Sequence, residues 1–99
     1  MPIKAFLRDE RGETLDSVLG LCLRPLIPAM DDGSSPCLRF IDPYGDTMFN
    51  VWQAKALLRE LASRRSGADG VDQESIDRLA ALVARCAEGI HLYLWFVGD

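Results

Sequence analysis

Histidine, cysteine and long apolar runs are scarce in this sequence, and each scarcity excludes a class of protein. The single histidine, His91, has no second histidine or cysteine at ligand spacing, so no zinc-site pattern is present. Cys22, Cys37 and Cys86 are odd in number and form no C-x-x-C pair, which predicts buried thiols in a reducing compartment. We therefore expect no bound metal and no cofactor.

No segment has the pattern of a targeting or membrane-spanning sequence. Lys4 and Arg8 place charges where a signal peptide would need an apolar run. The most apolar stretch, residues 19–30, is shorter than a bilayer requires and contains Arg24 and two prolines. The sequence therefore predicts a cytoplasmic protein.

The size and charge are those of a small acidic domain. The 99 residues carry a formal net charge of −4 and 48% of them are hydrophobic, which predicts one globular domain over residues 1–99. A nucleic-acid partner is disfavoured, because phosphate binding relies on clustered Lys and Arg. The acidic charge suits a basic protein partner, although it also serves solubility alone.

The first part of the chain predicts one strand and one ambiguous segment. Alternation over residues 3–8 predicts a strand, followed by a polar turn. Residues 14–28 fit two periods, because their apolar residues match a helical stripe while their leucines also alternate as in a strand. Thr14 can cap the helical version, so we favour a short helix that stops at Pro25.

The clearest local pattern is a hairpin signal in "CLRFIDPYGDTMFN". Asp42, Pro43 and Gly45 occupy the first, second and fourth positions of a type I turn. Residues 37–42 and 46–49 are therefore predicted to pair as antiparallel strands. Gly45 is expected to take the left-handed conformation and to close the hairpin with a bulge.

An amphipathic helix is predicted directly after this hairpin. Asn50 fits an N-cap with Gln53 as its capping-box partner, and the helix is expected to run to about Arg65. Glu60 and Arg64 stand four residues apart, which places them as a pair on its solvated side. Its apolar stripe consists of Val51, Ala54, Leu57, Leu58, Leu61 and Ala62.

A second amphipathic helix follows a short link over residues 66–70. Asp72 is its expected N-cap, and Gly89 is its expected C-terminal glycine cap. Its apolar stripe consists of Ile76, Leu79, Ala80, Val83 and Ala87. Two adjacent amphipathic helices are predicted to pack side by side on one face of a sheet.

The closing strand, residues 90–97, is apolar on both of its faces. One face carries Ile90, Leu92, Leu94 and Phe96, and the other carries His91, Tyr93, Trp95 and Val97. Such a strand is expected at the centre of a sheet. The fold class is therefore predicted as α+β: a small antiparallel sheet of about three or four strands with two adjacent helices packed on one face, in the order β-(α or β)-β-β-α-α-β.

Residues able to support catalysis are few, and each has a structural explanation. His91 lacks a partner group, and Asp42 and Asp46 lack the ligand spacing of a calcium loop. Asp42 is instead expected to accept hydrogen bonds from the backbone N–H groups of the turn. No nucleophile setting or phosphate-binding glycine loop is present, so we expect a protein that is not an enzyme.

Aromatic residues supply the best candidates for a binding role, because they are common among interface hot spots. Tyr44 lies at the predicted hairpin tip, and Trp52 starts the first helix away from its apolar stripe. The second face of the closing strand has two alternative fates: residues 14–28 cover it, or it contacts a partner. The candidate interface residues are Asp42, Tyr44, Asp46, Trp52, His91, Tyr93 and Trp95.

Three stretches, "LRFIDPYGDT", "FNVWQ" and "HLYLWFVGD", resemble a group of small bacterial proteins of unassigned function. That group combines a D-x-Y-G-D-T-type hairpin turn, an F-N-x-x-Q helix start and a last strand that closes with Gly-Asp. The resemblance covers the hairpin, the first helix and the last strand. It implies a bacterial source and this α+β arrangement, and it carries no activity.

Three functions remain open. The first is a small bacterial cytoplasmic protein-binding module, for example an immunity-type or antitoxin-like inhibitor that occludes the active site of a basic toxin or effector. The second is a homodimer whose sheets meet through the aromatic face of the closing strand. The third is a small-molecule-binding domain with a pocket lined by Asp42, Tyr44, Asp46 and His91.

Overall fold

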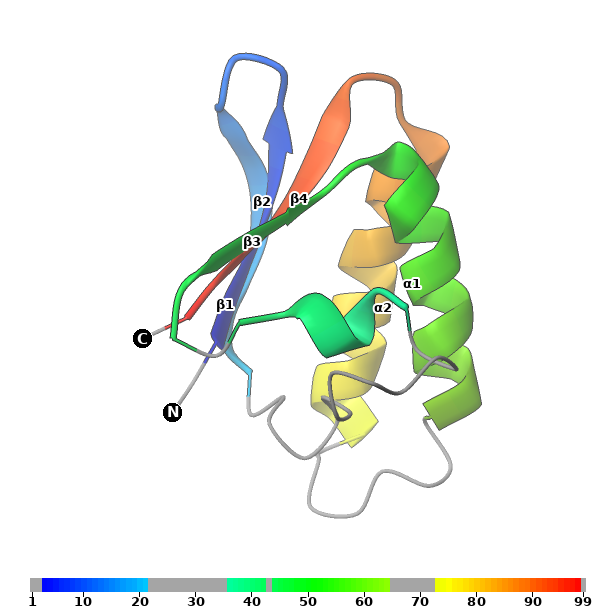
Figure 1. Ribbon diagram of the computed structural model, residues 1–99. Coiled ribbons are helices and arrows are strands. Elements are labelled where there is room, and N and C mark those ends of the chain that lie inside the picture. The colour runs from blue at the N-terminus through cyan, green and yellow to red at the C-terminus, as the bar shows by residue number, and fades with distance from the viewer. Residues whose placement is uncertain (1–2, 22–35, 43, 65–72, 99) are drawn as a thin grey trace.

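Two helices lie side by side on one face of a four-stranded antiparallel sheet (Figure 1). The computed structural model describes residues 3–21, 36–42, 44–64 and 73–98. The elements are β1 (Ile3–Asp9), β2 (Thr14–Leu21), the 3-10 helix η2 (Leu38–Phe40), β3 (Asp46–Phe49), α1 (Val51–Arg64), α2 (Gln73–Glu88) and β4 (Leu92–Val97). The predicted α+β class is confirmed, with the order β-β-β-α-α-β for the strands and the two main helices. Neither helix, within these ranges, has the length and apolarity that a bilayer span requires.

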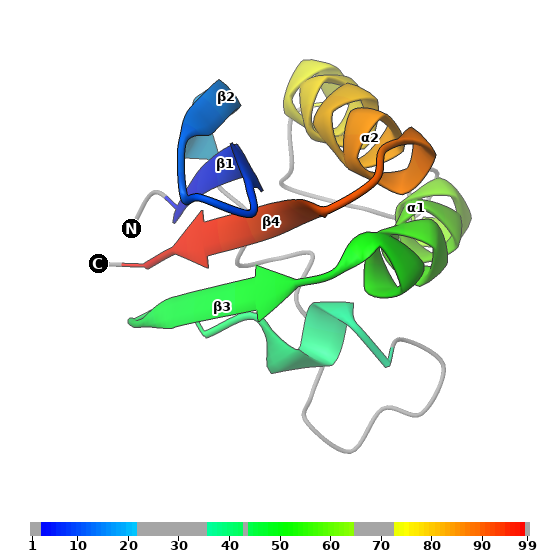
Figure 2. The ribbon, with the colours of Figure 1, turned by 90° about the horizontal axis from the view of Figure 1, so that it is seen from above.

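The last strand of the chain lies at the centre of the sheet, between the first strand and the third. The strand order is β2-β1-β4-β3 (Figure 2). β4 pairs antiparallel with β1 along Lys4–Asp9 and antiparallel with β3 along Asp46–Phe49. The central position predicted from the two apolar faces of this strand is therefore confirmed.

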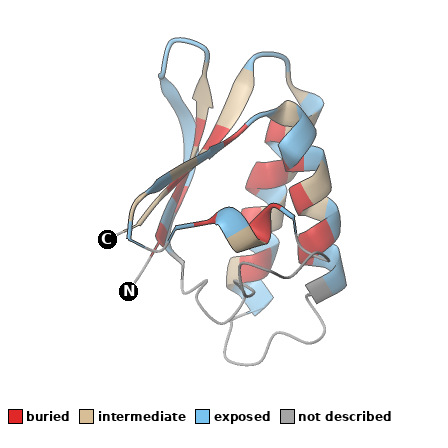
Figure 3. Cartoon of the chain, in the orientation of Figure 1, coloured by how far each residue is buried: buried red, intermediate tan, exposed pale blue. Residues whose placement is uncertain are grey.

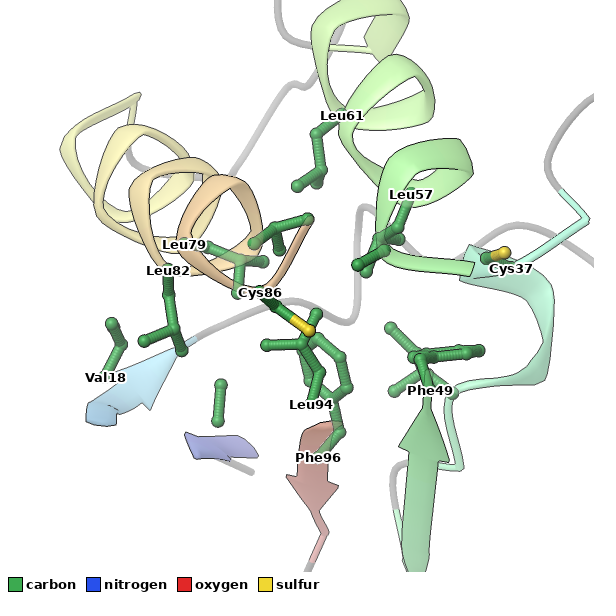
Figure 4. Packing of buried hydrophobic residues seen from close by; sticks show 14 of the residues in the cluster. Val18, Cys37, Phe49, Leu57, Leu61, Leu79, Leu82, Cys86, Leu94 and Phe96 are labelled. Atoms are coloured by element: carbon green, nitrogen blue, oxygen red, sulfur yellow. The ribbon is translucent and has the colours of Figure 1, made fainter. Parts of the chain in front are cut away.

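The core lies between the sheet and the two helices, where the buried residues gather (Figure 3). The sheet contributes alternate residues of its strands, and the labelled side chains of Figure 4 point from both layers into the same space. The predicted helical stripes supply the other layer with Ala54, Leu57, Leu61, Ile76, Leu79 and Val83, together with Leu82 and Cys86. Burying one large aliphatic side chain stabilises a fold by about 1.5–3 kcal/mol, so this layer holds the helices on the sheet.

α1 begins with the predicted capping box. The Gln53 N–H donates to Asn50 Oδ1 at 2.9 Å, and the Asn50 N–H donates to Gln53 Oε1 at 2.9 Å. Asn50 directly follows β3, so the end of the strand and the start of the helix share one residue. This cap therefore fixes where the chain leaves the sheet. The cap expected for the second helix, Asp72, and the link over residues 66–70 lie outside the described residues.

Residues 14–21 form a strand, so the helix expected over residues 14–28 is wrong for this part. β2 pairs antiparallel with β1 after a tight turn in which Gly12 has a φ of 83°. Val18 alone is buried among residues 14–20, and it pairs with the buried Ala5 of β1. Pairing with β1 satisfies the backbone groups of this segment and decides between the two periods. Residues 22–28 lie outside the described residues.

Residues 37–42 do not form a strand, so the predicted hairpin with residues 46–49 is wrong. This segment contains the 3-10 helix η2, and β3 pairs with β4 instead. A side-chain bridge replaces the expected ladder: Thr47 Oγ1 accepts a hydrogen bond from the Asp42 N–H at 3.0 Å and donates one to the Phe40 carbonyl at 3.4 Å. The local turn pattern could not reveal that β3 has another partner.

The turn inside this segment is present. The Gly45 N–H donates to the Asp42 carbonyl at 3.4 Å, and Asp42 Oδ1 accepts from the Tyr44 N–H at 2.9 Å, as expected for Asp at this position. The left-handed conformation expected for Gly45 is not observed. Glycine is needed there because a Cβ atom would lie 2.7 Å from Asp42 Oδ2.

Glu60 is buried, so its predicted place on the solvated side of the first helix is wrong. Only 7% of the residue is exposed. Its carboxylate accepts hydrogen bonds from the backbone N–H groups of Cys37, at 3.1 and 3.2 Å, and of Leu38, at 3.0 Å. These donors stand at the start of η2, where a helix leaves its N–H groups without partners. Glu60 therefore attaches η2 to α1 while the buried Leu38 side chain enters the core.

β4 begins at Leu92, two residues later than expected. His91 has a left-handed φ of 57°, which ends the alternation, and Ile90 is 80% exposed and not part of the core. Gly89 follows the helix and donates its N–H to the Cys86 carbonyl at 3.1 Å, but it is not left-handed. A Cβ atom on Gly89 would overlap the Leu92 side chain, so close approach of β4 requires the glycine.

Replacing Glu60 with glutamine tests the link between α1 and η2. Glu60→Gln is expected to lower the free energy of unfolding by about 1–3 kcal/mol, because the amide nitrogen cannot accept from a backbone N–H. Urea denaturation measures this change. Glu88→Gln, at an exposed position, is the matched control and should stay within about 0.5 kcal/mol of the parent protein. Equal stability of the two variants would contradict the role assigned to Glu60.

Candidate functional site

The candidate site is the face of the sheet turned away from the helices, called the outer face below. It consists of the side chains of β1, β3 and β4 that alternate with buried ones. All of them are exposed or half-buried. They are Lys4, Phe6, Arg8, Asp46, Met48, Tyr93, Trp95 and Val97.

The central row of the outer face is apolar and crosses three strands. Trp95 on β4 pairs with Phe6 on β1 and with Met48 on β3. Side chains at directly opposite positions have Cβ atoms about 4.5–5.5 Å apart, so these three form a continuous strip. Ser17 on β2 pairs with Phe6 and ends the row on a small polar side chain.

Arg8 lies over this row. Its guanidinium carbon is 4.8 Å from the centroid of the Phe6 ring and 5.3 Å from that of the Trp95 ring. Arg8 Nε also donates to Thr14 Oγ1 on the neighbouring strand at 3.3 Å. Contact of a cation with two aromatic faces orders all three side chains. The outer face therefore has a prearranged aromatic and cationic centre.

Charged and polar residues stand on either side of the central row. Towards the end of β4, Val97 pairs with Lys4 of β1 and with Asp46 of β3, so a cation and an anion flank one apolar residue. Towards the start of β4, Tyr93 pairs with Arg8. The outer face thus has an apolar middle, with the cations Lys4 and Arg8 on β1 and the anion Asp46 on β3.

No element in the described part of the chain covers the outer face. Both helices pack on the opposite face (Figure 1). Residues 14–21, half of the segment considered as a cover, lie in the sheet as β2, and residues 22–28 lie outside the described residues. Met48 is 48% exposed, and Trp95 and Tyr93 are half-buried by their neighbours.

Two other predicted residues, Trp52 and His91, meet elsewhere. They line an open groove of about 330 Å³ between the start of α1 and the start of β4, together with Lys55 and Ile90. Trp52 is 75% exposed, and Lys55 Nζ lies 4.5 Å from the centroid of its ring. His91 Nδ1 is 4.0 Å from Glu10 Oε2 of the β1–β2 turn. His91 therefore does not share the outer face with Tyr93 and Trp95, because it precedes the strand.

The acidic candidates lie at the other end of the sheet. Asp42 and Tyr44 belong to the turn before β3, and Asp46 opens that strand beside Val97. His91 precedes the first residue of β4, and the six residues of that strand separate the two ends by about 20 Å. The structure therefore does not bring Asp42, Tyr44 and Asp46 into one pocket with His91.

The two described cysteines are structural. Burial, followed by the neighbouring Glu60 carboxylate, raises the pKa of Cys37 to about 11. Burial raises the pKa of Cys86 to about 11 as well. Cys37 Sγ donates a hydrogen bond to the Gln53 carbonyl at 3.6 Å. Thiols that stay protonated at neutral pH are weak nucleophiles, so both residues act as small core side chains.

Five members of the outer face are not among the predicted interface residues: Lys4, Phe6, Arg8, Met48 and Val97. Alternation along each strand would have placed each of them opposite a buried neighbour. Which of them stands beside Trp95 depends on the register of β1 and β3 against β4. That register links distant segments, and no local pattern encodes it.

Neither a metal centre nor a relative adds to this picture. Across the ranges that the structure describes, no group of three His, Cys, Asp or Glu residues is placed to hold a metal ion. No family model, curated protein or solved structure matches the chain. The residues of the outer face therefore carry the functional argument.

Variants with a single tryptophan test whether the outer face is accessible. In Trp52→Phe the emission comes from Trp95, and in Trp95→Phe it comes from the 75% exposed Trp52. Acrylamide is expected to quench Trp95 in dilute protein to an intermediate degree, below Trp52, because Arg8 shields one part of the ring. Adding Arg8→Ala should increase the quenching of Trp95 and leave that of Trp52 unchanged. A Trp95 that resists acrylamide at high dilution would contradict an uncovered outer face.

Proposed function

We propose that this chain is a small protein-binding module that acts by surface contact through its outer face. The observation that carries the proposal is the row of Phe6, Trp95 and Met48, which no described element covers, with Arg8 held over two of its rings. Trp and Arg are enriched among the residues that dominate binding energies, and Phe and Met are enriched at the centres of interfaces. The face of a sheet suits the surface of another protein, whereas small molecules require concave pockets.

A binding role without catalysis is supported by the placement of the titratable residues. The Asp42 carboxylate is engaged within its own turn. Asp46 and His91 stand at opposite ends of β4. Burial raises the pKa of both Cys37 and Cys86 and keeps the two thiols protonated. These groups therefore do not combine into a nucleophile with an adjacent base.

The charges of the outer face indicate what its partner presents. Lys4 and Arg8 stand against Asp46, so the excess of acidic residues that gives the chain its charge of −4 lies elsewhere, for example in the turn over residues 9–13. A complementary partner surface has an apolar centre with groups of both signs beside it. In the immunity-type form of this proposal, a bacterial cytoplasmic inhibitor occludes its target by laying the apolar row over the target's active site. The mixed charge of this face supplies less attraction to a strongly basic target than the net charge of the chain suggests.

Charge introduced at the centre of the outer face tests the proposed function. Trp95→Asp is expected to weaken retention of a stoichiometric protein partner by about 30-fold or more, because it removes the central anchor and buries a carboxylate. The tagged protein is expressed in its native cell, and native mass spectrometry of the purified material gives the mass and stoichiometry of what it retains.

Trp52→Asp is the matched control, since it changes an equally large residue that is 75% exposed and lies outside the outer face. This control should retain the partner, and circular dichroism should show that both variants are folded. Identical retention by the two variants would count against the outer face as the binding surface. Isolation of the parent protein as a free monomer would count against a protein partner altogether.

A further inference from the structure

We infer that the outer face binds a second copy of this chain about a two-fold axis parallel to β4. The inference rests on the proposed function, because it concerns the same surface, and it names the partner. It follows from the order of side chains across the sheet. That order is self-complementary for one of the two directions of the two-fold axis that keep the strands of the two copies aligned.

An axis that lies over β4 and runs parallel to it places β1 of one copy over β3 of the other. Positions along the strands are unchanged by this rotation, so each cross-strand row faces the same row of the second copy. Lys4, Val97 and Asp46 form one such row. Lys4 of each copy then faces Asp46 of the other, and the two Val97 side chains meet on the axis. This row therefore forms two ion pairs, one on each side of the contact between the two Val97 side chains.

The central row is self-complementary in the same orientation. Phe6 of each copy faces Met48 of the other, and Trp95 faces Trp95 across the axis. Sulfur over an aromatic ring and one indole against another are both favourable contacts. The apolar strip therefore faces an apolar strip of the same length, and Arg8 of each copy lies over part of its own Phe6 and Trp95 rings.

The alternative two-fold axis runs across the strands and reverses the order of the rows. With Trp95 at its centre, this rotation places Lys4 of one copy over Arg8 of the other, since these residues stand two positions to either side of Phe6 on β1. Two such repulsions replace the two ion pairs, and Asp46 has no cation opposite it. Charge complementarity therefore selects the axis parallel to β4.

The expected dimer is weak. Only β1, β4 and β3 overlap in this arrangement, because no strand lies beyond β3 to face β2. Three strands about 4.8 Å apart and six residues of β4 make a shared face of about 10 Å by 20 Å, which is small beside the roughly 800 Å² that each partner buries in a standard interface. The two Arg8 guanidinium groups also approach the same end of the interface, although each stays stacked over the rings of its own chain. We therefore expect a dimer that forms and dissociates with concentration in the micromolar range or above.

Sedimentation equilibrium of paired charge reversals tests the inference. In the symmetric dimer, Lys4→Asp makes two carboxylates face each other at both sites, and Asp46→Lys makes two ammonium groups face each other at both sites. Both changes replace attraction with repulsion. Each variant alone is expected to raise the dissociation constant about tenfold or more over that of the parent protein. An equimolar mixture of the two variants should regain dimers, because at both sites of the mixed dimer a cation again faces an anion. Arg78→Asp and Glu13→Lys, at exposed positions off the outer face, are the matched controls and should dimerise like the parent.

Three results would overturn the two-fold arrangement: a parent protein that stays monomeric up to millimolar concentration, a dimer whose affinity neither reversal changes, or a mixture that associates no better than its components. The proposed function fails on a different result. A monomeric parent that still retains a foreign protein in a Trp95-dependent way overturns the second copy as partner and keeps the outer face as the binding surface. A partner or dimer that tolerates Trp95→Asp overturns both.

Discussion

The pairing of β4 on both of its edges is the constraint on which the rest of this structure depends. β1 and β3 have no hydrogen bonds to each other, and only the strand between them joins them into one sheet. Without β4, each would have an edge of backbone N–H and C=O groups with no strand to pair with, and an unpaired buried N–H or C=O group is strongly unfavourable. Leu94 and Phe96, which are fully buried, would also be missing from under the helices. The sheet therefore closes only when the last residues of the chain pair with the first strand.

The outer face is a product of the same pairing. Its central row takes Phe6 from β1, Met48 from β3 and Trp95 from β4, and the three become neighbours only when β4 is in place. Arg8 is likewise ordered by rings from two strands. A surface assembled in this way is present in the folded chain and absent from any single strand of it. If the outer face binds as proposed, folding and binding competence are acquired together.

The local features of the fold could be predicted from the sequence, whereas its long-range features could not. Alternation identified β1 and β4, and the Asn50 capping box identified the start of α1, because each depends on residues a few positions apart. Residues 37–42 fit a hairpin locally, because a turn is indeed present at Asp42. The strand that pairs with β3 is β4, which lies at the other end of the chain and gives no local signal. The local spacing predicts an exposed Glu60. Its carboxylate instead accepts hydrogen bonds from two backbone N–H groups that lie 22 and 23 residues away, and nothing near Glu60 in the sequence indicates this.

The same division holds for the candidate site. The strand pattern predicts that Trp95 and Tyr93 share one face, and the structure places both on the outer face. Strict alternation also predicts His91 on this face. The left-handed backbone of His91 ends the alternation, so the side chain does not lie there. Phe6 and Met48 can be placed beside Trp95 only when the register of three strands is known.

Net charge and local charge pattern act over different distances on this surface. The formal charge of −4 makes two copies repel each other weakly at long range, and salt screens this repulsion over about 8–10 Å. At contact, the order of the side chains decides the orientation of the two copies in the proposed dimer. Lys4 and Asp46 stand on opposite sides of Val97, and their separation across β4 is the same in both copies. The chain is therefore acidic as a whole, while the surface proposed for binding carries the two cations Lys4 and Arg8 against the single anion Asp46. The sign of the net charge predicts how fast such molecules meet, and the row order of the outer face predicts how they are oriented once they have met.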